Sequence, residues 1–146
     1  MKDPDCIFCK IAAGEIPSNK VYETDNVLVF LDAFPAQEGH CLVIPKEHAR
    51  DLLDLPEETA TEVLPVAKKV MQAMEKILKP HGYSIIQNNR EQAGQEVFHY
   101  HLHIVPRYKG RGPRGSRHAL TPDNYEYKPG KADLQEIARK IGSAVL

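Results

Sequence analysis

The sequence lacks several features that would by themselves assign a chain to a membrane, secreted or polyanion-binding class. No uninterrupted apolar run is long enough to cross a membrane, and Met1–Asp5 has no apolar segment typical of a signal peptide. Three cysteines are too few for a disulfide scaffold. The 19 basic and 20 acidic residues give a formal net charge of −1, which predicts no general attraction to nucleic acid or to membranes. These absences favour a cytoplasmic protein.

The composition that remains is sufficient for one folded domain. The chain has 146 residues, and 42% of them are hydrophobic, so one core can form without help from a second domain. No internal repeat is present, and only segment 108–118, rich in glycine and arginine, approaches low complexity. Its basic residues either contact a phosphate or keep a loop solvated. We therefore predict a single domain over 1–146.

The most unusual stretch is 98–107, in which His99, His101 and His103 alternate with apolar residues. This alternation predicts a strand with three imidazoles on one face, spaced by about 6.6 Å between neighbours and about 13 Å between the outer two. One metal ion could bind two of these rings but hardly three. The pattern favours a row of imidazoles along a negatively charged group, with one ring acting as nucleophile or acid/base.

A second chemical signal is the Cys6-x-x-Cys9 pair, which lies in a short amphipathic segment that predicts a helix ending near Gly14. This spacing is typical of metal ligands or of a redox pair. No strand precedes the pair, as thioredoxin-like chemistry would require, so the redox reading is the weaker one. A zinc ligand pair completed by histidines is favoured.

The remaining pattern predicts an α+β arrangement. A polar loop over 88–95 leads into the histidine run, so the strands on either side of it should be antiparallel. The long helix contains Pro65, which should kink or break it. The expected strands are 20–23, 26–31, 40–45 and 83–87; the expected helical segments are a turn at 51–55, the long helix at 56–79 and an amphipathic C-terminal helix at 132–146.

Several motifs together resemble the histidine triad (HIT) family, and specifically its zinc-binding, prokaryotic-type nucleotide-binding proteins. They are His99–Val105, Ala93–Gln95, Phe30–Asp32, Gly39-His40 and Leu42–His48. The resemblance covers 6 to about 109. It implies an α+β fold in which an antiparallel sheet of about five strands carries one long helix and a C-terminal helix, with the sheet continued across a homodimer.

The resemblance also implies a function. Family members cleave or transfer at the α-phosphorus of nucleoside phosphoramidates or dinucleoside polyphosphates, through a nucleotidyl-histidine intermediate that releases a nucleoside monophosphate. His101 matches the nucleophile, and His103 and His40 match residues that hold the phosphate oxygens. The expected contacts to a purine nucleotide are Phe8, Ile11 and Phe30 around the base, Asp32 on the ribose hydroxyls, and Asn88, Gly94, Gln95 and His103 around the phosphate.

The same resemblance assigns the cysteine pair. Cys6, Cys9, His48 and His99 match the ligands of a structural Zn²⁺ site. His99 would then anchor the histidine run to the N-terminal segment and take no part in the chemistry.

One residue departs from the family pattern. Glu96 stands where many relatives carry serine or threonine able to bond the phosphate, and an ionised carboxylate there would repel it. Either the side chain turns away and only its N–H faces the site, or the substrate preference is altered.

Two other functions stay open at this point. The chain could be a non-catalytic nucleotide-binding regulatory module that keeps the pocket, or a metal-dependent enzyme whose triad binds a catalytic ion. The spacing of the three imidazoles argues against the second of these. Neither alternative involves a membrane or a nucleic acid as partner.

Overall fold

The computed structural model describes residues 3–111 and 127–146. Most of the predicted basic loop, from residue 112 onward, lies outside the described residues. Among the described residues, no helix is long and apolar enough to cross a membrane.

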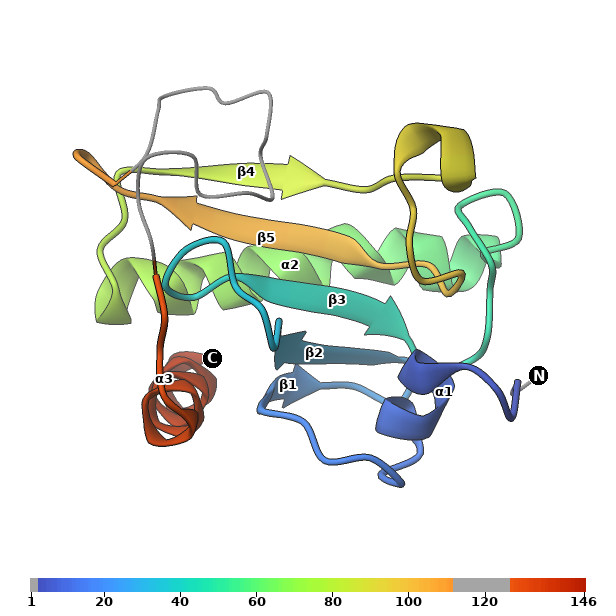
Figure 1. The fold of residues 1–146 in the computed structure, drawn as a ribbon, viewed down its shortest axis with the longest axis horizontal. Helices are drawn as coiled ribbons and strands as arrows, with labels where there is room; N and C mark the ends of the chain where they lie inside the picture. Colours follow the sequence, from blue (N-terminus) through green and yellow to red (C-terminus); the bar gives the residue numbers. More distant parts are fainter. Residues whose placement is uncertain (1–2, 112–126) are drawn as a thin grey trace.

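The chain forms one antiparallel sheet of five strands in the order β1-β2-β3-β5-β4 (Figure 1). The strands are β1 (Lys20–Glu23), β2 (Val27–Leu31), β3 (Cys41–Pro45), β4 (Gly82–Ile86) and β5 (Leu102–Arg107). The central strands β2 and β3 are buried along their whole length, so both faces of the sheet are covered. This architecture confirms the α+β prediction with about five strands.

One face of the sheet carries the main core. Helix α2 (Glu57–Ile77) contacts β2 and β3, and helix α3 (Lys131–Ala144) packs on α2 and β1. Alternate strand residues such as Val27, Val29 and Val43 point into this core, together with Met74 of α2. The periodicity of the two amphipathic helices therefore supplies the apolar surface that covers this face.

The opposite face carries a smaller core beneath the short N-terminal helix α1 (Ile7–Ala12). Its members are the intervening residues of the same strands and one side chain of α1: Phe8, Leu28, Phe30, Leu42 and Ile44. The register places Phe30 opposite Leu42, and Leu42 opposite His103 on β5. Phe30, Leu42 and His103 thus form a cross-strand row that connects the apolar core under α1 with the histidines.

The histidine run differs from the predicted strand. Only His103 lies within β5, while His99 and His101 belong to the segment that precedes it. Pro45, at the end of the neighbouring strand, has no N–H to continue the ladder. The N–H of Tyr100 donates instead to the carbonyl of Ala49 at 2.6 Å. His99 and His101 therefore lie outside the regular strand, and their side chains need not point to the same face.

The helical segments follow the predictions closely. Residues 51–55 form turns closed by backbone bonds from the N–H of Asp54 to the carbonyl of Asp51 and from the N–H of Leu55 to the carbonyl of Leu52, and Asp51 Oδ1 caps them by accepting the N–H groups of Leu53 and Asp54. Pro65 was expected to kink or break helix α2; it is exposed, and the helix continues through it without a break. The antiparallel pairing of β4 with β5 is as predicted.

Candidate active site

His101 and His103 open onto a cavity of about 600 Å³ on the sheet face that carries α1. This volume lies in the range of small-molecule sites. Phe8 and Ile11 of α1 and Phe30 of β2 form part of its wall. Asp32, His40, Asn88, Gly94, His101 and His103 line it as well. An apolar wall and a set of polar groups thus meet in one cleft.

His101 has one ring nitrogen fixed and the other available. Its Nδ1 lies 2.8 Å from the carbonyl oxygen of His99, and since a carbonyl only accepts, Nδ1 must carry the proton. Burial lowers the pKa of His101 below 6.5, which keeps the ring neutral near pH 7. Nε2 therefore has a lone pair, and the ring lies 5.2 Å from that of Phe8, edge to face.

His40 and His103 form a chain of fixed tautomers. The backbone N–H of Ala36 donates to His40 Nδ1 at 2.9 Å, so the proton of the neutral ring lies on Nε2. That Nε2 lies 2.9 Å from His103 Nδ1 and donates to it. His103 must then carry its own proton on Nε2. Both rings are neutral near pH 7, since burial lowers the pKa of His40 to about 3 and that of His103 to about 4.

Asp32 closes this group at the end of β2. Its Oδ1 accepts the N–H of Phe34 at 2.9 Å, and its Oδ2 lies 3.5 Å from His40 Nε2. Burial raises the pKa of Asp32, and the bond from Phe34 opposes that shift. The carboxylate stays within the cavity lining, where it can accept hydrogen bonds from a ligand.

Asp32, His40 and His103 also have the composition of a metal site, with ligand atoms within 4.8 Å of one another. A metal ion there would need the lone pair of His40 Nε2. The N–H of Ala36 keeps the ring proton on that atom, so neutral His40 would have to lose its remaining ring proton to bind a cation. The hydrogen-bond pattern therefore favours a proton-ordered chain over a catalytic metal site.

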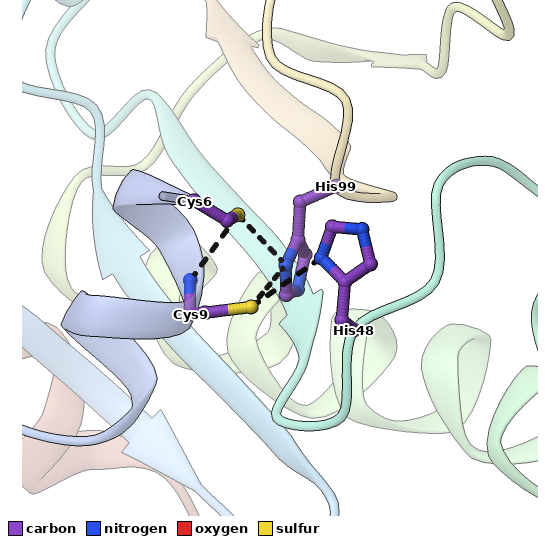
Figure 2. A group of neighbouring side chains, drawn as sticks. All are labelled: Cys6, Cys9, His48 and His99. Carbon is purple, nitrogen blue, oxygen red and sulfur yellow. Dashed lines mark hydrogen bonds between the residues drawn. The ribbon is translucent and has the colours of Figure 1, made fainter. Parts of the chain in front are cut away.

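A separate cluster joins the N-terminal helix to the histidine run (Figure 2). Cys6 precedes α1 and its Sγ accepts the N–H of Cys9, which caps the helix. Sγ of Cys6 lies 3.4 Å from Nδ1 of His99, and Sγ of Cys9 lies 3.3 Å from Nδ1 of His48 and 3.5 Å from Nδ1 of His99. The four ligand atoms lie within 4.8 Å of one another.

These four residues fit a zinc ion. Zn–S and Zn–N bonds of about 2.3 and 2.0–2.1 Å in a tetrahedron separate sulfur and nitrogen by roughly 3.6 Å, close to the distances found here. His99 Nε2 donates to the carbonyl of Pro45 at 2.8 Å, so Nδ1, which faces the sulfurs, carries the lone pair. Four protein ligands leave no open position, which is the pattern of a structural site.

The predicted site residues therefore separate into groups. The four predicted zinc ligands converge in one cluster, and most predicted nucleotide-binding residues line one cavity. Gln95 is the exception. It is buried and does not line the cavity; its side chain accepts the N–H of Arg90 and donates to the carbonyls of Arg50 and Val97. Glu96, the departure from the family pattern, does line the cavity.

Several cavity residues were not identified from the sequence. Leu42 could have been found from strand alternation, because it lies opposite Phe30. Val97 and Phe34 lie in loops, where no periodicity predicts the direction of a side chain. The further lining residues are Ile7, Pro17, Ser18, Asn19, Leu31 and Ala33.

Comparison with known proteins identifies relatives that agree on one family. The family model described as HIT domain matches residues 13–110. The Bacillus subtilis protein named Protein hit is 44% identical over 140 residues, which cover 94% of this chain and 92% of that protein. The Schizosaccharomyces pombe protein named adenosine 5'-monophosphoramidase hnt1 is 41% identical over 139 residues, covering 93% of this chain and 98% of that one.

Solved structures support the same assignment. A zinc-bound histidine triad family protein from Mycobacterium smegmatis superposes with a TM-score of 0.79 at 35% identity, covering 97% of this chain and 93% of that one. The family match spans all five strands and helix α2, including the whole histidine run. With relatives above 40% identity along nearly its full length, this chain belongs to the HIT family.

Proposed function

We propose that this protein is a nucleotide hydrolase or transferase that acts at the α-phosphorus of nucleoside phosphoramidates or dinucleoside polyphosphates. The observation that carries the proposal is the bond from His101 Nδ1–H to the carbonyl of His99, which leaves Nε2 unprotonated in a cavity of nucleotide size. The similarity to a fungal protein named adenosine 5'-monophosphoramidase supports the phosphoramidate class.

In the first step, His101 Nε2 forms a bond to the α-phosphorus while the bond from phosphorus to the leaving nitrogen or oxygen breaks. The leaving group takes a proton from water. The imidazole becomes cationic, and the carbonyl of His99 stabilises it through the Nδ1–H. In the second step, water attacks the phosphorus and the bond from phosphorus to His101 Nε2 breaks, while the proton lost by this water neutralises the hydroxide left by the first step. The nucleoside monophosphate leaves, and neutral His101 is restored.

The other histidines have distinct roles in this proposal. His103, with its proton on Nε2, donates a hydrogen bond to a phosphoryl oxygen, where charge develops in the transition state. The resemblance placed His40 on the phosphate oxygens, but both of its ring nitrogens are engaged by Ala36 and His103, so we assign His40 the role of orienting His103. Asp32 accepts from the ribose hydroxyls, and Phe8, Ile11 and Phe30 enclose the purine.

The proposal includes a Zn²⁺ ion held by Cys6, Cys9, His48 and His99. Bound zinc supplies structural cross-linking and no step of the reaction. Its four ligands would tie α1, which carries Phe8, to the segment that carries His101. Reduced thiols of this kind are typical of the cytoplasm, where we place the protein.

We also expect a homodimer in which β4 pairs with its symmetry mate. Among the described strands, β4 has one neighbour only, and α3 packs against β1 at the other edge. Ile85 on β4 is 41% exposed, which suits an open edge that another chain covers. Analytical ultracentrifugation of wild type and Ile85→Lys tests this: a wild-type monomer would contradict it.

Intact-mass spectrometry after brief mixing with adenosine phosphoramidate tests the function. The wild type should gain the mass of an adenylyl group, and His101→Ala should not. His81→Ala is a matched control, since His81 is an exposed histidine whose Nδ1 accepts the N–H of Lys109. If the wild type binds AMP but forms neither adduct nor product, the non-catalytic binding role is supported instead.

A further inference from the structure

The loop between β4 and the histidine run contains a residue in a conformation that normally requires glycine. Arg90 has φ 77° and ψ 167°. This region is essentially restricted to glycine, and other residues occupy it only where surrounding contacts impose it. The rest of the loop must therefore contain the contacts that hold Arg90 in place.

The backbone of Arg90 is held from both sides. Its N–H donates to Gln95 Oε1 at 2.6 Å. Its carbonyl accepts the N–H groups of Ala93 and Gln95, each at 3.1 Å. The loop is thus closed on itself around Arg90, and the buried amide of Gln95 provides one of the closing bonds.

The side chain of Arg90 ties this loop to the segment after β3. Its Nε donates to Asp51 Oδ2 at 3.0 Å. Asp51 is fully buried, and its other oxygen accepts the N–H groups of Leu53 and Asp54. The guanidinium of Arg90 holds the pKa of Asp51 below its ordinary value, so the carboxylate stays charged near pH 7.

Two further bonds cross between the same segments. Asn89 Oδ1 accepts the N–H of Leu52 at 2.8 Å, and Gln95 Nε2 donates to the carbonyl of Arg50 at 2.7 Å. The loop and the 50–54 turn therefore form one clamped unit. Asn88 and Gly94, on either side of Arg90 in this loop, line the cavity together with His101 and His103.

We infer that Arg90 and Asp51 are positioning residues, which hold the loop in a strained shape so that Asn88 and Gly94 face the phosphate of a bound nucleotide. The inference rests on the proposed function, because it assigns this end of the cavity to the phosphate. Neither residue touches the substrate: Arg90 acts through the backbone of the loop, and Asp51 acts through Arg90.

Three variants separate conformation from charge. Arg90→Ala removes the anchor but leaves a residue that resists positive φ, whereas Arg90→Gly removes the anchor and accepts this backbone shape freely. Arg139→Ala is the matched control, since Arg139 pairs with Glu136 on the exposed face of α3. Arg50, whose Nε lies 3.6 Å from Asp51 Oδ2, remains in every variant.

Calorimetric titrations with AMP and with adenosine provide the readout. In Arg90→Ala, we expect AMP to bind about tenfold more weakly and turnover of adenosine phosphoramidate to fall about 10- to 100-fold. Adenosine, which has no phosphate, should bind as to the wild type. Arg90→Gly should stay within about threefold of the wild type in all three measurements, since glycine keeps the loop shape. Arg139→Ala should change none of them.

Asp51→Asn tests the pairing, because asparagine keeps the oxygen that accepts from the turn. Alone, Asp51→Asn should weaken AMP binding and lower turnover as much as Arg90→Ala does. In the Arg90→Gly background, it should not change the ratio of the AMP affinity to the adenosine affinity any further. Equal losses in Arg90→Ala and Arg90→Gly would overturn the inference by showing a charge effect. So would parallel losses for AMP and adenosine, which indicate general destabilisation. If the wild type binds no AMP, the proposed function itself fails.

Discussion

His99 and His101 lie two residues apart on the same run, yet their rings are arranged in opposite ways. His99 donates through Nε2 to the carbonyl of Pro45 and turns Nδ1 toward two cysteine sulfurs. His101 donates through Nδ1 to the carbonyl of His99 and leaves Nε2 free in the cavity. One ring thus turns its lone pair toward the two cysteine sulfurs, and the other turns its lone pair into the cavity.

This comparison shows that the partner of the second ring nitrogen decides the role of a histidine. His103 provides a third case, because His40 donates to its Nδ1 and the remaining nitrogen becomes a donor. In the proposed function, three residues of one type therefore serve as a metal ligand, a nucleophile and a hydrogen-bond donor. Substitutions at each of these rings test whether the three roles can be separated.

The largest effect is expected from His101→Ala, which should affect turnover and leave the zinc site unchanged. His101→Ala should lower turnover of adenosine phosphoramidate by on the order of 10⁴-fold or more, because no other described side chain presents a matching lone pair there. Zinc content and melting temperature should stay close to those of the wild type. Steady-state kinetics measures turnover, and elemental analysis measures zinc. Loss of zinc from this variant would show that the roles of His99 and His101 are not separate.

The converse substitution should act on stability. His99→Ala removes one of four zinc ligands, so we expect less than one zinc per chain and a melting temperature lower by on the order of 10 °C. Differential scanning calorimetry of the untagged protein measures the shift. A metal-free wild type whose Cys6 and Cys9 are freely alkylated would contradict the zinc site altogether.

The neutral histidines of the cavity should make stability depend on pH. Burial lowers the pKa of His103 from 6.5 to about 4, so the unfolded chain binds the extra proton first as pH falls. The free energy of unfolding should then be highest above pH 6.5 and fall toward pH 4, by on the order of 3 kcal/mol from this residue. Urea unfolding at several pH values tests this, and His103→Gln should flatten the slope.

A smaller loss is expected where a ring acts only through another ring. His40→Ala frees His103 Nδ1 and its tautomer, so turnover should fall by about 10- to 100-fold while the zinc content is unchanged. Loss of the bond from His40 should also change the pH profile of turnover, because the tautomer of His103 is then no longer fixed. Simple unfolding of the variant would lower turnover without this change in the profile. A loss as large as that of His101→Ala would mean that His40 contacts the reacting group.

The smallest effect is expected at Glu96, which lines the cavity on an exposed loop. Glu96→Ser removes a negative charge near the phosphate, and AMP should bind about two- to fivefold more tightly, less so at high salt. Isothermal titration at two salt concentrations measures this. Glu136→Gln on α3 is the control for the change of net charge, and weaker binding by Glu96→Ser would assign Glu96 a favourable contact.

The sequence alone predicted the helices and strands wherever a local pattern of residues controls the structure. Apolar periodicity predicted the long helix and the C-terminal helix, and turn residues bounded the strands close to their observed limits. It did not show what two polar side chains contact: Asp51 caps its own turn, and the side chain of Gln95, which was expected near the phosphate, bonds to the backbone of its loop. In both cases a polar side chain bonds to nearby backbone, which no periodicity reveals.

What the sequence determined by itself is which chemical groups are available and roughly where: three alternating histidines, a cysteine pair and a loop that leads to them. Only the tertiary structure decided which nitrogen of each ring is free. The deciding partners are the carbonyl of Pro45, 54 positions before His99, and the N–H of Ala36, which reaches His103 through His40. A hydrogen bond depends on distance in space, and folding alone brings these distant groups within reach.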